Sequence, residues 1–354
     1  MFGTTWRMPA EWEPHERTWM AFPPSGYLLG ANDSDAHTAR TVWAKVANAI
    51  VDFEPVSMLC NKADLETARG YLDPRVELME CKLDDAWMRD IGPSFVKGVS
   101  GIGVVDPEAE GEARFRSVEG LLGGVNWEFN GWGNQGWANF ENDSKVAGKI
   151  NKAIDAIDLA TPLINEGGAI HVNGSDTVLL TKTVQLGEGR NFMWSQQEVE
   201  AEIHRKLGTS RAVWFERGLT RDYEEFGTRG HVDMIATFCS EDTVLFHDQQ
   251  NPEHPDFAVS RNIEKTLQAA GLKGIGLRAP LILRDRHGWV DYNYVNHYVI
   301  NGAVILCGFN DPNDSRAVTT LQSVYPDRKI IQINATEIFA RGGGIHCITQ
   351  QQPR

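Results

Sequence analysis

The sequence lacks the features that define several large classes of protein. Its five cysteines are odd in number and widely scattered, which fits reduced thiols better than a disulfide framework. No two of them have Cys-x-x-Cys spacing and no His-Glu-x-x-His motif occurs, so we expect no zinc site. No stretch of eighteen apolar residues is present, and the first residues, MFGTTWRMPAEWEPHERTW, have neither the basic start nor the apolar run of a signal peptide. We therefore expect a cytoplasmic protein without a membrane partner.

The chain also has fewer basic than acidic residues. The chain has 34 lysines and arginines against 48 aspartates and glutamates, which gives a net charge of −14. This charge argues against nucleic acid as a partner and favours small cationic molecules, which it would attract by electrostatic steering.

What the sequence does contain is an alternation of helices and strands without a low-complexity linker. At 354 residues, 42% of them hydrophobic, the chain has enough apolar material for one large domain or two ordinary ones. Apolar residues recur at the helical period in five segments that start about 50 to 65 residues apart, except for one gap of double length. These segments are 38–53, 144–157, 195–208, 260–271 and 315–326. Strand-like runs such as VSMLC, AVWF and KIIQIN follow them, so the pattern predicts an α/β fold.

Three polar clusters stand at the ends of strand-like segments, and each has an ordinary structural explanation when taken alone. In DDAWMRDIGPSFV (84–96), Asp90 can form a plain ion pair with the adjacent Arg89. In INEGGAIHVNG (164–174), two glycines after Glu166 indicate either a turn or a close backbone approach. In TRGHVDMIATF (228–238), His231 and Asp233 share one face if the segment is a strand.

Together with Cys347 in the last segment, these clusters favour chemistry on a guanidinium group. A guanidinium is planar and cationic, so two carboxylates can hold it flat and orient its central carbon. A cysteine thiolate can attack that carbon, and the bound cation itself lowers the pKa of the thiol. A histidine can then protonate the departing ammonia and later activate water.

Five segments together resemble the agmatine deiminase branch of the peptidyl-arginine deiminase-like family, in the guanidino-group-modifying superfamily. They are MPAEWEPHERTWMAFP (8–23), DDAWMRDIGPSFV, EGGAIHVNG, GHVD and GGGIHCITQQQP. The resemblance extends from residue 8 to residue 353, so it implies one catalytic domain over 1–354. It also implies a five-bladed α/β propeller with pseudo-fivefold symmetry (the pentein fold), with the active site on the central axis and no metal or organic cofactor.

The resemblance implies the following site. The nucleophile is Cys347, the catalytic histidine is His231, and the guanidinium-binding acids are Asp85 and Asp233. Glu166 pairs with the histidine and the substrate, and we also expect Trp87 and Gly344 to contact the substrate. His346, adjacent to the nucleophile, is not expected to act directly, because neighbours in a strand point to opposite faces. The remaining cysteines are interpreted as core residues or left unassigned.

The resemblance implies hydrolysis of agmatine to N-carbamoylputrescine and ammonia in polyamine synthesis, by a homo-oligomer that we expect to be a dimer. Three residues depart from the usual agmatine deiminase pattern, namely Arg229, Met234 and Gly344, and so does the segment 129–143. An inward-pointing Arg229 would favour a substrate carboxylate, whereas an outward-pointing Arg229 would pair with Glu224, Glu225 or solvent. Three alternatives therefore remain: deimination of arginine, peptidyl-arginine or a guanidino acid; amidino transfer from Cys347 to an amine; and guanidinium sensing without catalysis.

Overall fold

The computed structural model describes residues 6–100, 102–104 and 115–354. Five of its sheets share one pairing order, in which a central strand has an antiparallel partner on one side and a parallel partner on the other. The central strands with their parallel partners are β2 (His15–Ala21) with β3 (Val56–Cys60), β8 (Leu122–Glu128) with β9 (Ile157–Ile164), β11 (Thr177–Thr181) with β12 (Arg211–Phe215), β14 (Thr243–Asp248) with β15 (Lys273–Arg278), and β19 (Ala303–Gly308) with β20 (Lys329–Asn334). The antiparallel partners are, in the same order, β21 (Gln350–Pro353), β5 (Ser94–Gly98), β10 (His171–Val172), β13 (Ala236–Phe238) and β18 (Tyr298–Ile300).

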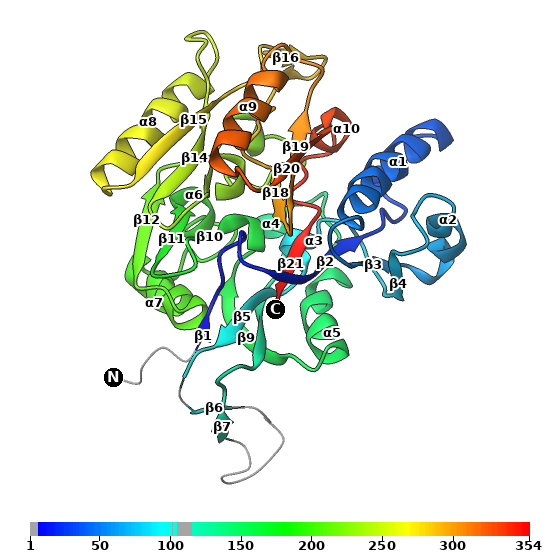
Figure 1. The fold of residues 1–354 in the computed structure, drawn as a ribbon, viewed down its shortest axis with the longest axis vertical. Coiled ribbons are helices and arrows are strands. Elements are labelled where there is room, and N and C mark those ends of the chain that lie inside the picture. The colour runs from blue at the N-terminus through cyan, green and yellow to red at the C-terminus, as the bar shows by residue number, and fades with distance from the viewer. Residues whose placement is uncertain (1–5, 101, 105–114) are drawn as a thin grey trace.

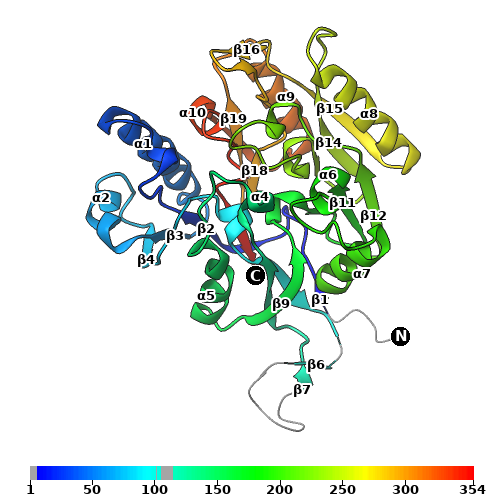
Figure 2. The same ribbon diagram turned by 180° about the vertical axis from the view of Figure 1, so that it is seen from behind.

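Each parallel pair is joined by a crossover that contains one long helix, as parallel pairing requires. These helices are α1 (Asp33–Ile50), α5 (Val146–Ala153), α7 (Gln196–Leu207), α8 (Asp256–Ala269) and α9 (Asp314–Val324). In Figures 1 and 2 they lie on the outside of the molecule, while the short helices α3 (Met88–Ile91) and α4 (Gly131–Asn134) and the strand β21 lie near the middle. The sequence prediction of an α/β fold with five amphipathic helices is thus confirmed.

Helix ends differ from the predicted ranges for local reasons. Helix α1 begins at Asp33 rather than at residue 38, because the Asn32 side chain caps it by accepting from the backbone N–H of Asp35. Helix α5 ends at Ala153, and Asp155 has a left-handed φ of 60° that stops the helical path. The capping box predicted at the start of α7 is present, with Ser195 and Glu198 bonded reciprocally.

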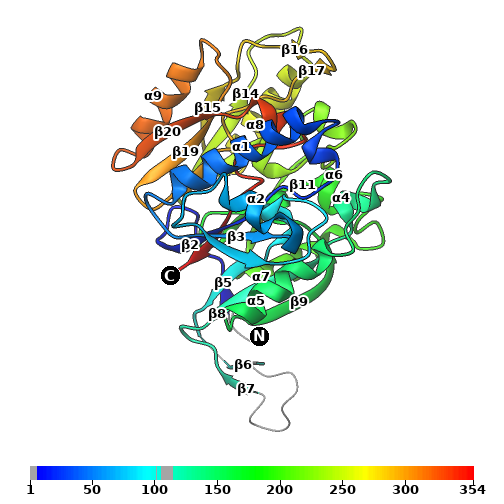
Figure 3. The same cartoon turned by 90° about the vertical axis from the view of Figure 1, so that its right-hand side faces the viewer.

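The smaller elements complete the sheets or lie outside them. They are β1 (Trp6–Arg7) on β5, β4 (Glu77–Glu80) on β3, the ribbons β6 (Ile102–Val104) with β7 (Phe115–Ser117) and β16 (Arg284–Asp285) with β17 (Gly288–Trp289), and the helices α2 (Leu65–Arg69), α6 (Lys182–Gln185) and α10 (Thr336–Phe339). The β6–β7 ribbon projects from one end of the molecule (Figure 3).

Three inner strands of the sheets are buried on both faces. Every residue of β3, β11 and β19 is buried, because helices cover one side of each sheet and the middle of the molecule covers the other. All five cysteines are free, as the sequence predicts. In the part of the chain that the structure describes, no helix is both long enough and apolar enough to span a bilayer.

Candidate active site

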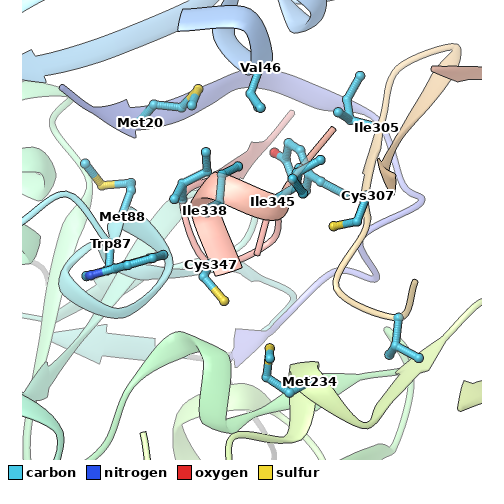
Figure 4. Packing of buried hydrophobic residues seen from close by; sticks show 14 of the residues in the cluster. Met20, Val46, Trp87, Met88, Met234, Ile305, Cys307, Ile338, Ile345 and Cys347 are labelled. Atoms are coloured by element: carbon cyan, nitrogen blue, oxygen red, sulfur yellow. The ribbon is translucent and has the colours of Figure 1, made fainter. Parts of the chain in front are cut away.

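The site begins with the C-terminal strand, which returns to the middle of the molecule. Strand β21 pairs antiparallel with β2, with Gln351 opposite Thr18, and the turn just before β21 carries Cys347. Figure 4 shows Cys347 at the end of this C-terminal segment, between Trp87 on one side and Met234 on the other. A cysteine close to the end of the sequence therefore meets residues from three other parts of the chain.

Polar groups surround the thiol on several sides. The backbone N–H of Gly344 points at Sγ from 3.4 Å, and the amide Nδ2 of Asn296 lies 3.3 Å away. The thiol in turn donates to Oδ2 of Asp233 at 3.7 Å. Burial, reinforced by the charges of Asp233 and Asp90, raises the pKa of Cys347 well above its ordinary value, so the thiol is protonated at neutral pH.

His231 is fully buried among acidic groups. Its Nε2 lies 3.4 Å from Oε2 of Glu166, and its Nδ1 lies 3.8 Å from Oδ1 of Asp90. Burial disfavours the charged imidazolium, but these two carboxylates outweigh burial and raise the pKa of His231 to about 9. The imidazole is therefore protonated at neutral pH, which suits a proton donor.

Glu166 is held in place by a cation on its other side. Arg190 donates from Nε to both oxygens of Glu166, at 2.9 and 3.1 Å, and from Nη2 to the carbonyl of Thr228. Burial works against ionisation, yet the Arg190 charge holds the pKa of Glu166 below its ordinary value. Glu166 is thus an anion of fixed orientation beside His231.

The two glycines after Glu166 allow the close approach that the sequence suggested. A Cβ on Gly168 would lie 2.6 Å from Nδ1 of His231, 2.9 Å from Oδ1 of Asp90 and 3.1 Å from Oδ2 of Asp233. A Cβ on Gly167 would lie 2.1 Å from the carbonyl oxygen of Arg89. Glycine is therefore required here so that the three charged side chains can converge on one point.

The acid that reaches this point from the 84–96 segment is Asp90. Its Oδ1 accepts from the N–H of Gly168 at 3.0 Å and its Oδ2 accepts from the indole of Trp132 at 2.8 Å. Burial raises the pKa of Asp90 to about 6, although the charge of His231 pulls the other way. The interpretation of Asp90 as the ion-pair partner of Arg89 was wrong, because Arg89 donates to Gln351 and approaches Glu11 instead.

The structure does not bring Asp85 to the same place. Asp85 is buried, but its carboxylate accepts from the N–H of Ala86 and bonds to the hydroxyl of Tyr27, and it does not line the cavity beside Cys347. The expectation that Asp85 lies beside Cys347 is therefore not met, and Asp90 is the acid of this segment that lies there. Asp85 supports the site from behind, since Tyr27 also accepts from the indole of Trp87 at 2.7 Å.

A small cavity lies over the thiol, and we call it the inner cavity. Its volume is about 10 Å³, and its lining residues are Trp87, Asp90, Trp132, Trp137, Phe226, Thr228, Gly342 and Cys347. Its aromatic residues pack closely: Trp132 stacks on Trp137 at 5.2 Å, and Phe226 stacks on Tyr27 at 4.7 Å. The cavity has space for about one water, and we call Trp87, Trp132, Trp137 and Phe226 its aromatic wall.

Three residues in and around this wall have a strained backbone. Trp132, Phe226 and Arg229 have left-handed φ values of 56°, 67° and 73°, which bulky side chains rarely adopt. Asp222 holds the segment that contains Phe226 and Arg229, because its carboxylate accepts hydrogen bonds from the backbone N–H groups of Thr228, Gly230 and His231. Nothing in the sequence pattern marked Asp222, Asn296 or Arg190. Asn296 and Arg190 act through contacts far along the chain, and the contacts of Asp222, six to nine residues away, depend on the turn that its segment forms.

The other predicted site residues have clear positions. Trp87 lines the inner cavity, whereas Gly344 contributes its backbone N–H to Cys347 and has no room for a side chain, since a Cβ would lie 2.3 Å from Asn296. Met234 is buried beside Asn293. Arg229 donates to the carbonyl of Tyr223 and lines a separate outer pocket of about 520 Å³ rather than the inner cavity.

A buried trio on the far side of Asp233, consisting of Glu11, His171 and His346, has the composition of a metal site. Its nitrogens are already engaged: His346 bonds to Asp233 and Glu11, and His171 bonds to Thr237 and the N–H of Phe238. The guanidinium of Arg89 also lies 3.6 Å from Glu11. We therefore interpret the trio as a hydrogen-bonded cluster.

The α/β fold and the buried cysteine with carboxylates around it define an α/β enzyme that acts on a cationic group. The chain belongs to the Porphyromonas-type peptidyl-arginine deiminase family, whose model matches residues 7–353. A protein of Streptomyces coelicolor is 49% identical over 358 residues, which cover 99% of each chain. The agmatine deiminase of Pseudomonas aeruginosa is 33% identical over 98% of this chain and 95% of its own. The solved agmatine deiminase of Enterococcus faecalis superposes with a TM-score of 0.85 at 28% identity and covers 100% of this chain and 99% of its own.

Proposed function

We propose that the protein is an agmatine deiminase that hydrolyses agmatine to N-carbamoylputrescine and ammonia, a step in putrescine and polyamine synthesis. The relatives named above support this activity. The observation that carries the choice of agmatine is the charge of the inner cavity. Among the described residues that line it, Asp90 is the acid and none is a lysine or arginine, so nothing there pairs with a substrate carboxylate. The aromatic wall suits the aliphatic chain and distal ammonium of agmatine.

The guanidinium is proposed to lie between Asp90 and Asp233. Two buried polar atoms at this point have no hydrogen-bond partner, Oδ1 of Asp233 and Nδ1 of His231. Buried polar atoms are rarely left without partners, so Oδ1 of Asp233 is available to accept from the guanidinium and Nδ1 of His231 is available to donate its proton to the leaving nitrogen. The positive charge of the guanidinium would also lower the pKa of Cys347 and release the thiolate.

The proposed reaction has two stages. The thiolate of Cys347 attacks the central guanidinium carbon, and the C–N bond breaks as His231 protonates the leaving ammonia. Water then loses a proton to His231 and attacks the amidino carbon, and the C–S bond breaks to give the carbamoyl product and the free thiol. Glu166 orients His231 and stabilises its imidazolium, and no metal or organic cofactor takes part.

We further propose that the five sheets are the blades of a propeller with pseudo-fivefold symmetry, the pentein fold. Support comes from their shared pairing order and from Cys347, His231 and Asp90 belonging to segments next to three different sheets. The whole chain, 1–354, then forms one catalytic domain. A cytoplasmic location, which five free thiols favour, and a homodimer complete the proposal.

The substrate proposal is tested by ammonia release from agmatine, arginine, guanidinobutyrate and an arginyl peptide. We expect kcat/KM for agmatine to exceed that for arginine by at least about 100-fold, because an α-carboxylate would be left unpaired against the aromatic wall. The Cys347→Ala protein is the blank. Preference for a carboxylate-bearing guanidine would instead favour deimination of a guanidino acid, with the same nucleophile.

The pH dependence of kcat/KM is expected to be bell-shaped, with limbs near pH 6 and pH 9. Asp90 must be ionised to hold the guanidinium, so activity falls as pH drops through its pKa of about 6. His231 must be protonated to release ammonia, so activity falls as pH rises through its pKa of about 9. Initial rates at subsaturating agmatine from pH 4.5 to 10.5 measure both limbs. An optimum above pH 10 would contradict the role of His231.

A further inference from the structure

A line of three buried charged side chains runs from the thiol of Cys347 into the protein behind it. Asp233 accepts from Nδ1 of His346 at 2.8 Å through Oδ2, the same oxygen that the Cys347 thiol approaches at 3.7 Å. His346 contacts Glu11 through Nε2, also at 2.8 Å. All three side chains are at most 5% exposed. Because both ring nitrogens face carboxylates, the ring is a donor at both ends and carries a positive charge.

Glu11, at the far end of this line, is also held in a fixed position. The second oxygen of Glu11 accepts from the backbone N–H of Val299 at 2.8 Å. The backbone N–H of His346 donates to the side chain of Asn296, whose amide also contacts Cys347. Glu11, Val299 and Asn296 come from segments distant from Asp233 in the sequence, so the line connects separate parts of the fold.

The near end of the line leaves one oxygen for the substrate. With Oδ2 of Asp233 bonded to His346, Oδ1 is the buried atom without a partner. A carboxylate with one bonded oxygen has a fixed orientation, and its second oxygen therefore points in one direction only. His346 was not expected to act directly on the assumption of a strand, in which neighbours face opposite sides. Residues 341–349 form a turn instead, so His346 and Cys347 both approach Asp233.

Resting on the proposed function, we propose that His346 is a positioning residue for deimination: held between Glu11 and Asp233 as an imidazolium, it orients Asp233 and keeps that carboxylate ionised for the guanidinium. This role differs from those of Cys347, the proposed nucleophile, and His231, the proposed proton donor, because both ring nitrogens of His346 are engaged by Asp233 and Glu11.

The charges around the line agree with this role. Burial and the nearby Arg89 oppose protonation of His346, yet Glu11 and Asp233 raise its pKa above the ordinary value. Burial would likewise raise the pKa of Asp233, but the hydrogen bond and charge of His346 lower it, with smaller contributions from His231 and Arg89. The ring of His171, 6.0 Å away, has its pKa lowered to about 3 mainly by burial and is neutral.

Two substitutions separate charge from shape. Both variants are uncharged. His346→Asn keeps a hydrogen-bond donor near the position of Nδ1, which faces Asp233. His346→Gln keeps a donor near the position of Nε2, which faces Glu11. We expect His346→Gln to lower kcat/KM for agmatine about 100-fold and His346→Asn about 10-fold, the usual range for a hydrogen bond to a charged group. In both variants the acid limb should move toward neutral pH and steepen, because Asp233 joins Asp90 among the acids that must first lose a proton.

The matched control is His254→Asn. His254 is also buried beside a carboxylate, that of Asp256 at 3.7 Å, and it lies outside the inner cavity. Its substitution should leave the acid limb in place. If the His346 variants melt normally and lose activity with an unmoved acid limb, the role of His346 is structural and the proposal is overturned. Should they fail to fold, Glu11→Gln, which retains an acceptor for His346, is expected to shift the limb in the same direction, and an unmoved limb there would equally overturn it.

A substrate-independent measurement separates this proposal from the proposed function. In protein labelled with carboxyl-¹³C aspartate, with the resonance assigned by Asp233→Asn, the Asp233 carboxyl should titrate at higher pH in the His346→Asn protein than in the parent. An unchanged titration would overturn the role of His346 whatever the substrate. A parent protein that shows this titration but releases no ammonia from agmatine would refute the proposed function alone.

Discussion

Replacing Cys347 with alanine is expected to lower the turnover of agmatine by about 10⁵-fold or more while agmatine still binds. The thiol is the atom that forms the covalent bond, and no other described residue that lines the inner cavity has a nucleophilic sulfur. Binding survives because the guanidinium is held by Asp90 and Asp233, neither of which is altered. Ammonia release measures the first effect, and calorimetric titration with agmatine measures the second.

The matched control is Cys60→Ala. Cys60 is fully buried in β3, its thiol contacts the carbonyl of Asn61, and it does not line the inner cavity. Its replacement should lower the melting temperature modestly, through the loss of packing, and leave kcat unchanged. Persistent ammonia release from pure Cys347→Ala protein would sink the assignment of the nucleophile.

Asp90→Asn is expected to lower kcat/KM for agmatine by about 10² to 10⁴-fold, because it removes one of two buried charges that face the guanidinium. The two oxygens of Asp90 both accept hydrogen bonds, from Gly168 and from Trp132. An asparagine has one acceptor oxygen, so its NH₂ would face one of these donors. The acid limb of the pH profile near pH 6 should also disappear, and steady-state kinetics across pH would show both effects.

Asp85→Asn is the companion variant that decides between the two acids. Burial raises the pKa of Asp85 to about 7, so a neutral side chain of the same shape imitates much of its population at neutral pH. We expect less than about a 10-fold loss, transmitted through Tyr27 and Trp87. A large loss in Asp85→Asn together with a small one in Asp90→Asn would restore the original assignment of Asp85.

The positions of Asp85 and Asp90 could not be predicted from the sequence. Asp90 follows Arg89 directly, which suggests an ion pair, but α3 turns successive side chains about 100° apart. Arg89 therefore points toward Glu11 and Gln351 while Asp90 points toward Gly168. Distances along the chain cannot show this, because the partners of each side chain come from segments far from 84–96.

The positions of His346 and Arg229 could not be predicted from the sequence either. His346 was not expected to act directly and does not line the inner cavity, yet it contacts Asp233 at 2.8 Å because its segment is a turn. Arg229 departs from the usual family pattern, yet its guanidinium bonds to the carbonyl of Tyr223 outside the inner cavity. In both cases local backbone conformation, including the left-handed φ of Arg229, directs the side chain.

By itself the sequence determined the α/β class and the five amphipathic helices, because these depend on local periodicity, and it predicted free cysteines from their number and spacing. Its motifs carried the resemblance to the family. It also singled out Cys347, His231, Glu166 and Asp233, each of which stands in a motif. Only the tertiary structure decided that Asp90 rather than Asp85 faces the thiol, that Asn296 and Arg190 support the site, and that an aromatic wall closes it. These facts depend on contacts between distant segments, which form only when the sheets pack together.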